Sequence, residues 1–308
     1  MTEIAKEILE KYQIRKTKAQ KTAFIDFLRS RFPELTVETG GLLKSRNLVV
    51  GNADTADVIF TAHYDTCAVL PFPNVLTPKN FLLYLIYNIL VIVPVFLGVW
   101  LVSYGVARLT ENFWASYWSG MAVLILFLFL LFAGKANPHT ANDNTSGVVT
   151  LCALLAALDD QERARAAFVF FDNEEVGLVG SALFKKMHRA ALAGRLVVNL
   201  DCVSDGDTIM VIQNKRARRT YGDALRRAFC AAEGKEIRLE KASSVFYPSD
   251  QINFPCNAAI AAFRRSKVFG YYLDKIHTKR DTCFDERNID YLCGALRRLL
   301  HEIGNPSA

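Results

Sequence analysis

The sequence predicts an α/β domain with a mixed, largely parallel central sheet flanked by helices, interrupted by a hairpin of two long apolar helices. Short, continuously apolar runs rich in β-branched and aromatic residues alternate with segments of helical periodicity, which is typical of strands buried on both faces of a sheet. Two long uncharged stretches follow one another in the first half of the chain and fall outside this alternation.

The apolar runs and the periodic segments define the expected elements of the domain. Strands are expected at Val58–Ala62, Ala167–Phe171, Leu196–Leu200 and Ala258–Phe263. Helices are expected at Thr17–Arg31, Ser146–Leu158, Leu178–His188, Tyr221–Glu233 and Ile289–Ile303. Because no internal repeat or low-complexity tract is present, we interpret residues 1–79 and 136–308 as one domain, with residues 80–135 inserted into it.

The inserted segment has the properties of a transmembrane hairpin. No charged residue occurs in Phe81–Tyr104 or in Phe113–Ala133, and a helix needs about 20 residues to cross about 30 Å of hydrocarbon. Aromatic residues that suit a membrane interface surround the short turn between the spans, namely Trp100, Tyr104, Trp114, Tyr117 and Trp118. Two buried core helices are the alternative, but two adjacent uncharged stretches of this length favour membrane spans. The apolar content of 51% and the mean hydropathy of +0.15 are also high for a soluble enzyme.

A hairpin places both flanking segments on the same side of the membrane. The outer ends of the hairpin are flanked by basic residues, namely Lys44, Arg46, Lys79 and Lys135, whereas the turn carries Arg108 against Glu111. The positive-inside rule therefore places the domain in the cytoplasm. The opening residues also lack the basic and apolar regions of a cleavable signal, and seven cysteines without a CxxC pair indicate free thiols in a reducing compartment. We expect an integral membrane protein with two transmembrane helices and a cytoplasmic domain.

The net charge of +6 is carried by basic clusters such as Lys215–Arg219, Arg226–Arg227 and Arg264–Arg265. Solvated helix faces explain such clusters by default, and contact with an anionic leaflet is the alternative. No recognition module or interleaved aromatic residue accompanies them, so nucleic acid is not an expected partner.

Polar residues follow three of the expected strands at the point where each ends. His63 and Asp65 follow the first strand, Glu174 and Glu175 the second, and Asp201 the third. In open α/β sheets the ligand crevice lies beyond the carboxyl ends of the strands. We therefore expect residues that are far apart in the sequence to meet there.

Two further residues complete a metal-binding set. Asp143 lies in the turn ANDNTSG, where by itself it would only cap the following helix, and His277 lies in the loop KIHTKRD. With the strand-end residues they supply the imidazole nitrogens and carboxylate oxygens that zinc prefers. Two zinc ions about 3.5–4 Å apart would stabilise both the attacking and the leaving oxygen of a hydrolysis.

The adjacent glutamates are expected to divide two roles between them. Burying Glu174 and Glu175 unpaired would be costly, so one is expected to bind metal and the other to act as a general base. Cys67 and Cys202 lie beside proposed ligands, but neither has a second spaced cysteine or an obvious base. We therefore do not expect Cys67 or Cys202 to act as a nucleophile or to bind zinc as a thiolate.

Taken together, these segments resemble the co-catalytic zinc exopeptidase family that includes the leucyl-type aminopeptidases, glutamate carboxypeptidase II and glutaminyl cyclase. The similarity extends from about His63 to the C-terminus, apart from the hairpin. It implies a zinc aminopeptidase-like fold and a cis peptide bond between Asp143 and Asn144. It also implies a role for each residue: His63 and Asp201 on one zinc, Glu175 and His277 on the other, Asp143 bridging them, Glu174 as the base, and Asp65 orienting His63.

The chain departs from the family pattern in two places. Relatives often have Ser-Asp-His where this chain has Ser249-Asp250-Gln251, which removes no metal ligand. In addition, the usually short connection between His63 and Asp143 contains the hairpin, so we expect the hairpin to border the substrate entrance.

The resemblance implies a zinc-dependent exopeptidase, with an aminopeptidase favoured, that uses two zinc ions on peptides with a free N-terminus. The apolar hairpin adds the expectation that this enzyme is anchored in a membrane. One alternative is a single-zinc acyltransferase similar to glutaminyl cyclase. Another is a catalytically inactive membrane scaffold of the same fold. All five ligands and both acidic helper residues are present, which argues against the scaffold.

Overall fold

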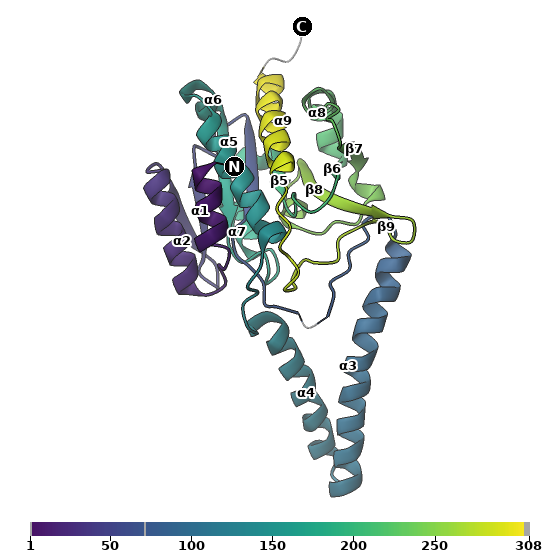
Figure 1. The fold of residues 1–308 in the computed structure, drawn as a ribbon. Helices are drawn as coiled ribbons and strands as arrows, with labels where there is room; N and C mark the ends of the chain where they lie inside the picture. The colour runs from purple at the N-terminus through teal and green to yellow at the C-terminus, as the bar shows by residue number, and fades with distance from the viewer. Residues whose placement is uncertain (1, 71, 305–308) are drawn as a thin grey trace.

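The computed structural model describes residues 2–70 and 72–304, and within them a mixed sheet of nine strands lies between layers of helices (Figure 1). The strand order is β1-β2-β4-β3-β5-β8-β6-β7, with β9 paired to β8. The strands are β1 (Thr36–Gly40), β2 (Ser45–Val50), β3 (Val58–His63), β4 (Ala166–Phe171), β5 (Leu196–Leu200), β6 (Thr208–Gln213), β7 (Glu236–Lys241), β8 (Asn257–Ser266) and β9 (Gly270–Tyr272). The central pairs β4–β3, β3–β5 and β5–β8 are parallel, which confirms the predicted fold class.

Seven helices belong to the domain and two to the hairpin, all within the described part of the chain. The domain helices are α1 (Glu3–Lys11), α2 (Lys18–Arg31), α5 (Gly147–Ala157), α6 (Asp160–Arg165), α7 (Val179–Met187), α8 (Lys215–Ala228) and α9 (Glu286–Gly304). The expected helix Tyr221–Glu233 is wrong in its bounds, because α8 begins earlier and also ends earlier. Asn214 caps its start by accepting a hydrogen bond from the backbone N–H of Ala217 at 2.8 Å.

Strands β1, β2, β6, β7 and β9 are not among the strands expected from the sequence. The edge strands β1 and β7 are only partly buried and have no continuous apolar run, so their local signal is weak. In contrast, β6 is buried along its whole length. It pairs antiparallel with β8 and parallel with β7, extending the sheet beyond the strands that carry the polar residues.

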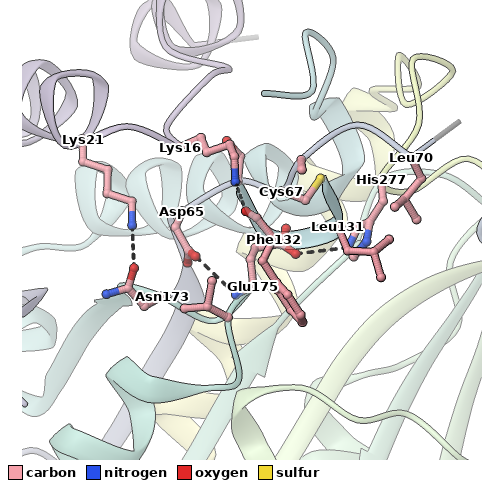
Figure 2. A pocket seen from close by; sticks show the side chains of 13 residues that line it. Lys16, Lys21, Asp65, Cys67, Leu70, Leu131, Phe132, Asn173, Glu175 and His277 are labelled. Carbon is pink, nitrogen blue, oxygen red and sulfur yellow. Dashed lines mark hydrogen bonds and ion pairs between the residues drawn. The ribbon is translucent and has the colours of Figure 1, made fainter. Parts of the chain in front are cut away.

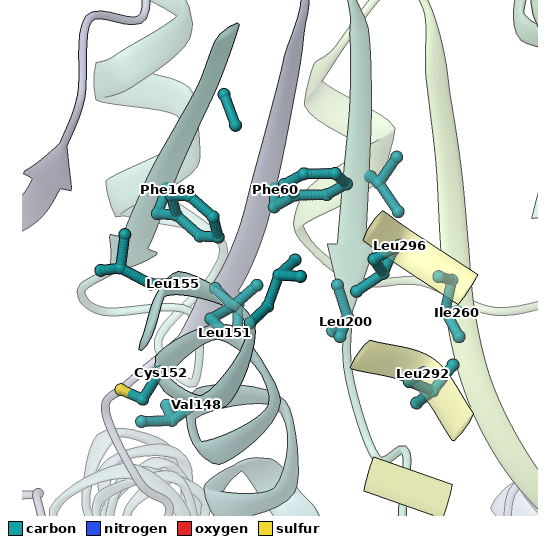
Figure 3. Packing of buried hydrophobic residues seen from close by; sticks show 14 of the residues in the cluster. Phe60, Val148, Leu151, Cys152, Leu155, Phe168, Leu200, Ile260, Leu292 and Leu296 are labelled. Carbon is teal, nitrogen blue, oxygen red and sulfur yellow. The ribbon is translucent and has the colours of Figure 1, made fainter. Parts of the chain in front are cut away.

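The central strands form the core because alternate side chains point to opposite faces and both faces are covered. On one face, Phe60 and Phe168 pack with Leu151 of α5 and Leu296 of α9 (Figure 3). On the other face, buried residues of the same strands pack against Phe184 of α7. The sheet is thereby held at a fixed position relative to the loops that follow its strands.

Helices α3 (Phe81–Thr110) and α4 (Phe113–Ala133) form the inserted hairpin and project away from the domain (Figure 1). Helix α3 continues past Tyr104 and ends where Glu111 adopts a left-handed backbone conformation. A Cβ atom at Gly120 would lie 2.2 Å from Oγ of Ser103, so glycine permits the close approach of the two helices. Gly120 is the one buried residue in the pair, and both helices are long and apolar enough to cross a membrane.

Candidate active site

The predicted site residues converge at the carboxyl ends of the parallel strands. His63 is the last residue of β3, and it pairs in register with Phe171, the last residue of β4. Glu174 and Glu175 follow β4, and Asp201 follows β5. The parallel arrangement therefore brings three loops to one edge of the sheet, as the sequence predicts.

The two remaining residues reach the same place from other segments. Asp143 lies at a kink in the turn η1 (Ala141–Ser146) that precedes α5, where its own backbone angles are not helical, and His277 lies in the loop between β9 and α9. The peptide bond between Asp143 and Asn144 is cis, as the family resemblance implies. A Cβ atom at Gly147 would lie 2.5 Å from Oδ1 of Asn144, so the start of α5 requires glycine to pack against this turn.

Asp143 stands between the two histidines. Its Oδ1 lies 3.4 Å from Nε2 of His63, and its Oδ2 lies 3.0 Å from Nε2 of His277. Asp201 Oδ1 lies 3.6 Å from the His63 nitrogen, and Glu175 Oε2 lies 3.2 Å from the His277 nitrogen. The site therefore consists of two adjacent sets of ligand atoms that share one carboxylate.

Asp65 fixes the orientation of both halves of the site. The Nδ1 atom of His63 faces the backbone carbonyl oxygen of Asp65 at 3.2 Å and its carboxylate at 3.6 Å, which leaves Nε2 directed at the shared aspartate. The same carboxylate accepts hydrogen bonds from the backbone N–H groups of Glu174 at 3.0 Å and Glu175 at 3.2 Å. One buried side chain thus positions a histidine and the pair of glutamates.

The electrostatics of the cluster favour a bound cation. Burial raises the pKa of Glu175 to about 8 and that of Glu174 well above its usual value. Burial lowers the pKa of His277, but Glu175 and Asp143 outweigh that effect and raise it to about 10. Positive charge is therefore strongly stabilised where the carboxylates meet.

The spacing of the donor atoms fits zinc. Two ligands that are each about 2.0–2.2 Å from a tetrahedral zinc ion lie about 3.3–3.6 Å apart. The separations within the cluster are close to this range: 3.4 and 3.6 Å from the His63 nitrogen to Asp143 and Asp201, and 3.2 and 3.0 Å from the His277 nitrogen to Glu175 and Asp143. Among the described residues, the buried oxygens Glu175 Oε1 and Asp201 Oδ1 accept no hydrogen bond, as expected of oxygens reserved for a metal. His63, Asp143 and Glu175 also offer ligand atoms that all lie within 4.8 Å of one another.

Two cysteines border the cluster. The thiol of Cys67 lies within 4.8 Å of ligand atoms of Glu175 and His277, and that of Cys202 lies equally near Asp143 and Asp201. Burial, together with the neighbouring carboxylates, raises the pKa of both thiols well above the usual value. The cluster thus favours the protonated form of each thiol.

Sequence reasoning missed three buried charged residues that support the site. Asp281 accepts hydrogen bonds from the backbone N–H groups of Asn142 and Asp143, both at 2.9 Å. Arg15 is fully buried, and its Nε donates to the carbonyl oxygen of Tyr64 at 2.5 Å, next to the His63 loop. Asp250 is also fully buried, and its charge contributes to the raised pKa of Glu174. Two of these residues lie in segments with a sequence signal: Asp250 in the Ser-Asp-Gln segment that departs from the family pattern, and Asp281 at the end of the KIHTKRD loop that contains His277.

Comparison with known proteins identifies the family. The model of the family described as Peptidase family M28 matches residues 130–291, which is more than half of the chain. The chain belongs to peptidase family M28. The match covers Asp143, the two glutamates, Asp201 and His277, and confirms the predicted relation to the co-catalytic zinc exopeptidases. Comparison with curated protein sequences gives no significant match.

Solved structures share the fold of this chain at low sequence identity. The LapA aminopeptidase of Legionella pneumophila aligns with a TM-score of 0.57 and 13% identity, over 97% of this chain and 69% of that one. The glutaminyl cyclase of an Acidobacteriales bacterium aligns with a TM-score of 0.57 and 13% identity, over 98% of this chain and 93% of that one. At these identities the similarity concerns the fold. Membership of peptidase family M28 supports a metallopeptidase-type hydrolase.

Proposed function

We propose that this chain is a membrane-anchored zinc aminopeptidase that removes residues from peptides with a free N-terminus. The observation that carries the proposal is the position of Asp143, whose two oxygens face two different histidines. This arrangement supports two zinc ions that share one carboxylate. His63 and Asp201 would hold one ion, and Glu175 and His277 the other.

The residues of the chain divide the chemistry between them. When bound, two zinc ions would polarise the scissile carbonyl and acidify the attacking water. Glu174, whose carboxylate lies within 4.8 Å of ligand atoms of His63 and Asp201, takes the proton from that water and delivers it to the leaving amine. Asp65 holds the His63 ring and the backbone of Glu174, so the base and the ligand keep their relative positions.

The length and the apolar surface of the hairpin support the proposal that it anchors the protein in a membrane. In the proposed arrangement, residues 1–79 and 136–308 form the peptidase domain, and residues 80–135 cross the bilayer twice. At about 1.5 Å per residue, the 21 residues of α4 extend about 31 Å, which matches a hydrocarbon core of about 30 Å. An apolar surface of this kind on both helices requires lipid or protein around it.

Activity and metal content of the full-length protein, purified in detergent, test the proposal. We expect stepwise release of residues from peptides with a free N-terminus, no release from the same peptides after Nα-acetylation, and two zinc ions per chain. A chelator should abolish the activity, and added zinc should restore it.

The same experiment separates the alternatives. Release of ammonia from an N-terminal glutamine by a protein with one zinc would identify a cyclase. Zinc-loaded protein that turns over neither class of substrate would indicate an inactive scaffold. Either result would contradict the aminopeptidase assignment.

A further inference from the structure

Residues of the ligand cluster line two cavities, and each cavity has a wall from the hairpin. One cavity, of about 230 Å³, contains Glu175 and His277 and is bounded by Leu131 and Phe132 at the end of α4 (Figure 2). The other, of about 190 Å³, contains side chains of both proposed metal sites and is bounded by Tyr84 of α3. We refer to them as the α4-side cavity and the α3-side cavity.

The start of α3 is fixed to the domain. The residues Leu76 and Leu273 exchange two backbone hydrogen bonds of 2.9 Å, and Lys79 forms an ion pair with Glu240 at 2.7 Å. The Tyr84 ring stands 5.0 Å from that of Phe246. These contacts hold Tyr84 in the wall of the α3-side cavity.

The end of α4 is fixed in a similar way. The backbone N–H of Val69 donates to the carbonyl oxygen of Lys135 at 2.9 Å. Lys16 donates from Nζ to the carbonyl oxygen of Phe132 at 2.5 Å, and Asn137 donates from Nδ2 to the carbonyl oxygen of Thr278 at 3.0 Å. The hairpin therefore joins the domain at two anchored points, one beside each cavity.

The wall residues lie where the hairpin meets the domain. Tyr84 is near the first residue of α3, and Leu131 and Phe132 are near the last residue of α4. The two helices separate toward the domain and meet at their far end (Figure 1). If the hairpin spans the bilayer, these three residues lie at the boundary between hydrocarbon and water, where an apolar peptide that binds membranes would also lie.

The size and chemistry of the cavities indicate what they accept. Both are smaller than the roughly 300–1,000 Å³ of pockets for drug-sized ligands, so each suits one or two residues of an extended peptide. The side chains from the hairpin are apolar or aromatic, and burial against them favours apolar residues on either side of the scissile bond.

We propose that Tyr84, Leu131 and Phe132 are specificity-determining residues, and that the substrates are apolar peptides presented to the site from the membrane surface. This inference rests on the proposed aminopeptidase function and adds to it a substrate class. The hairpin is then part of the substrate-binding site as well as the anchor.

The test compares wall residues with matched lipid-facing residues of the same helices. The wall variants are Tyr84→Ala and Phe132→Ala, and the controls are Tyr104→Ala and Phe129→Ala, two exposed aromatic residues outside both cavities. Each protein is reconstituted in phosphatidylcholine vesicles, and kcat/KM is measured for three peptides. Two are soluble and begin with Leu-Leu or Ala-Ala, and the third carries Leu-Leu on an apolar segment anchored in the vesicle.

We expect the wild type and both controls to prefer the anchored Leu-Leu peptide over the Ala-Ala peptide. In each wall variant, the ratio of kcat/KM for the anchored Leu-Leu peptide to that for the Ala-Ala peptide should fall about tenfold or more. Phe132→Leu, which keeps an apolar side chain, should retain most of the wild-type ratio. Zinc content serves as the measure of an intact fold for every variant. Unchanged preference in zinc-loaded wall variants would overturn the inference while leaving the aminopeptidase intact, whereas no cleavage of any peptide by the wild type would overturn the function itself.

Discussion

Asp65 illustrates how much of this site depends on single carboxylates with several partners. It faces the ring of His63, and its carboxylate accepts hydrogen bonds from the backbone N–H groups of Glu174 and Glu175. The histidine and the glutamates were predicted from their positions after strands, and the structure brings them together. Their relative orientation, however, comes from contacts of Asp65 across more than a hundred positions of sequence, which a local pattern does not contain.

The first prediction at this scale separates the roles of the two glutamates. Glu174→Gln should keep its metal and lose about 10²–10⁴ in kcat, because the amide cannot accept the proton from the attacking water. Glu175→Ala should lose zinc, because it removes the side chain that lies 3.2 Å from the His277 nitrogen. Elemental analysis and kcat measured on the same preparations check both expectations. Full metal loading with near wild-type turnover in Glu174→Gln would contradict its assignment as the base.

At the scale of elements, the helical turn η1 shows how a loop is fixed by a residue far from it in sequence. This turn holds the shared carboxylate of Asp143, and Asp281 binds two of its backbone N–H groups. Burial and the neighbouring Asp143 raise the pKa of Asp281 to about 8, although these two hydrogen bonds act to lower it. The position of Asp143 between the histidines therefore depends on the loop that precedes α9.

The prediction for this element concerns Asp281. Asp281→Ala would leave two buried N–H groups without an acceptor, at a cost of about 1–3 kcal/mol for each group. We also expect a loss of about 10–100-fold in zinc affinity, because Asp143 is no longer held in place. Asp281→Asn keeps one acceptor oxygen and should show a smaller loss of both quantities.

Thermal unfolding in detergent and zinc titration measure these effects. The matched control is Asp223→Ala, which removes an exposed carboxylate paired with Arg226 on α8 and should change stability by less than about 1 kcal/mol. Equal effects of Asp281→Ala and the control would show that Asp281 does not support the turn.

At the scale of the whole molecule, the carboxyl ends of the parallel strands and the two attachment points of the hairpin lie on the same side of the domain (Figure 1). The site therefore faces the bilayer if α3 and α4 span it. Lys16, Lys79 and Lys135 lie at this junction, whereas the far turn carries Arg108 and Glu111. The distribution of charge favours the domain on the cytoplasmic side.

The prediction for the whole molecule is a topology with both termini in the cytoplasm. A reporter that is active only in the cytoplasm should be active when fused after Ala308 and inactive when inserted near Thr110, in the far turn. Labelling of the exposed thiol of Cys230 gives an independent readout. A membrane-impermeant maleimide should label it in inverted vesicles and not in intact cells. The opposite pattern would place the domain outside the cytoplasm.

The sequence by itself determined the fold class, the family and the set of residues that meet at the strand ends. These features have local signals: apolar runs for the buried strands, uncharged stretches for α3 and α4, and polar residues directly after strands. Only the tertiary structure decided which other residues hold the site residues and the hairpin in place. The roles of Asp281, Arg15 and Phe132 have no local signal, because these residues act through contacts with residues 116–139 positions away. Such contacts depend on how the sheet, the turn η1 and the hairpin pack together, because packing selects partners by distance in space and not by distance along the chain.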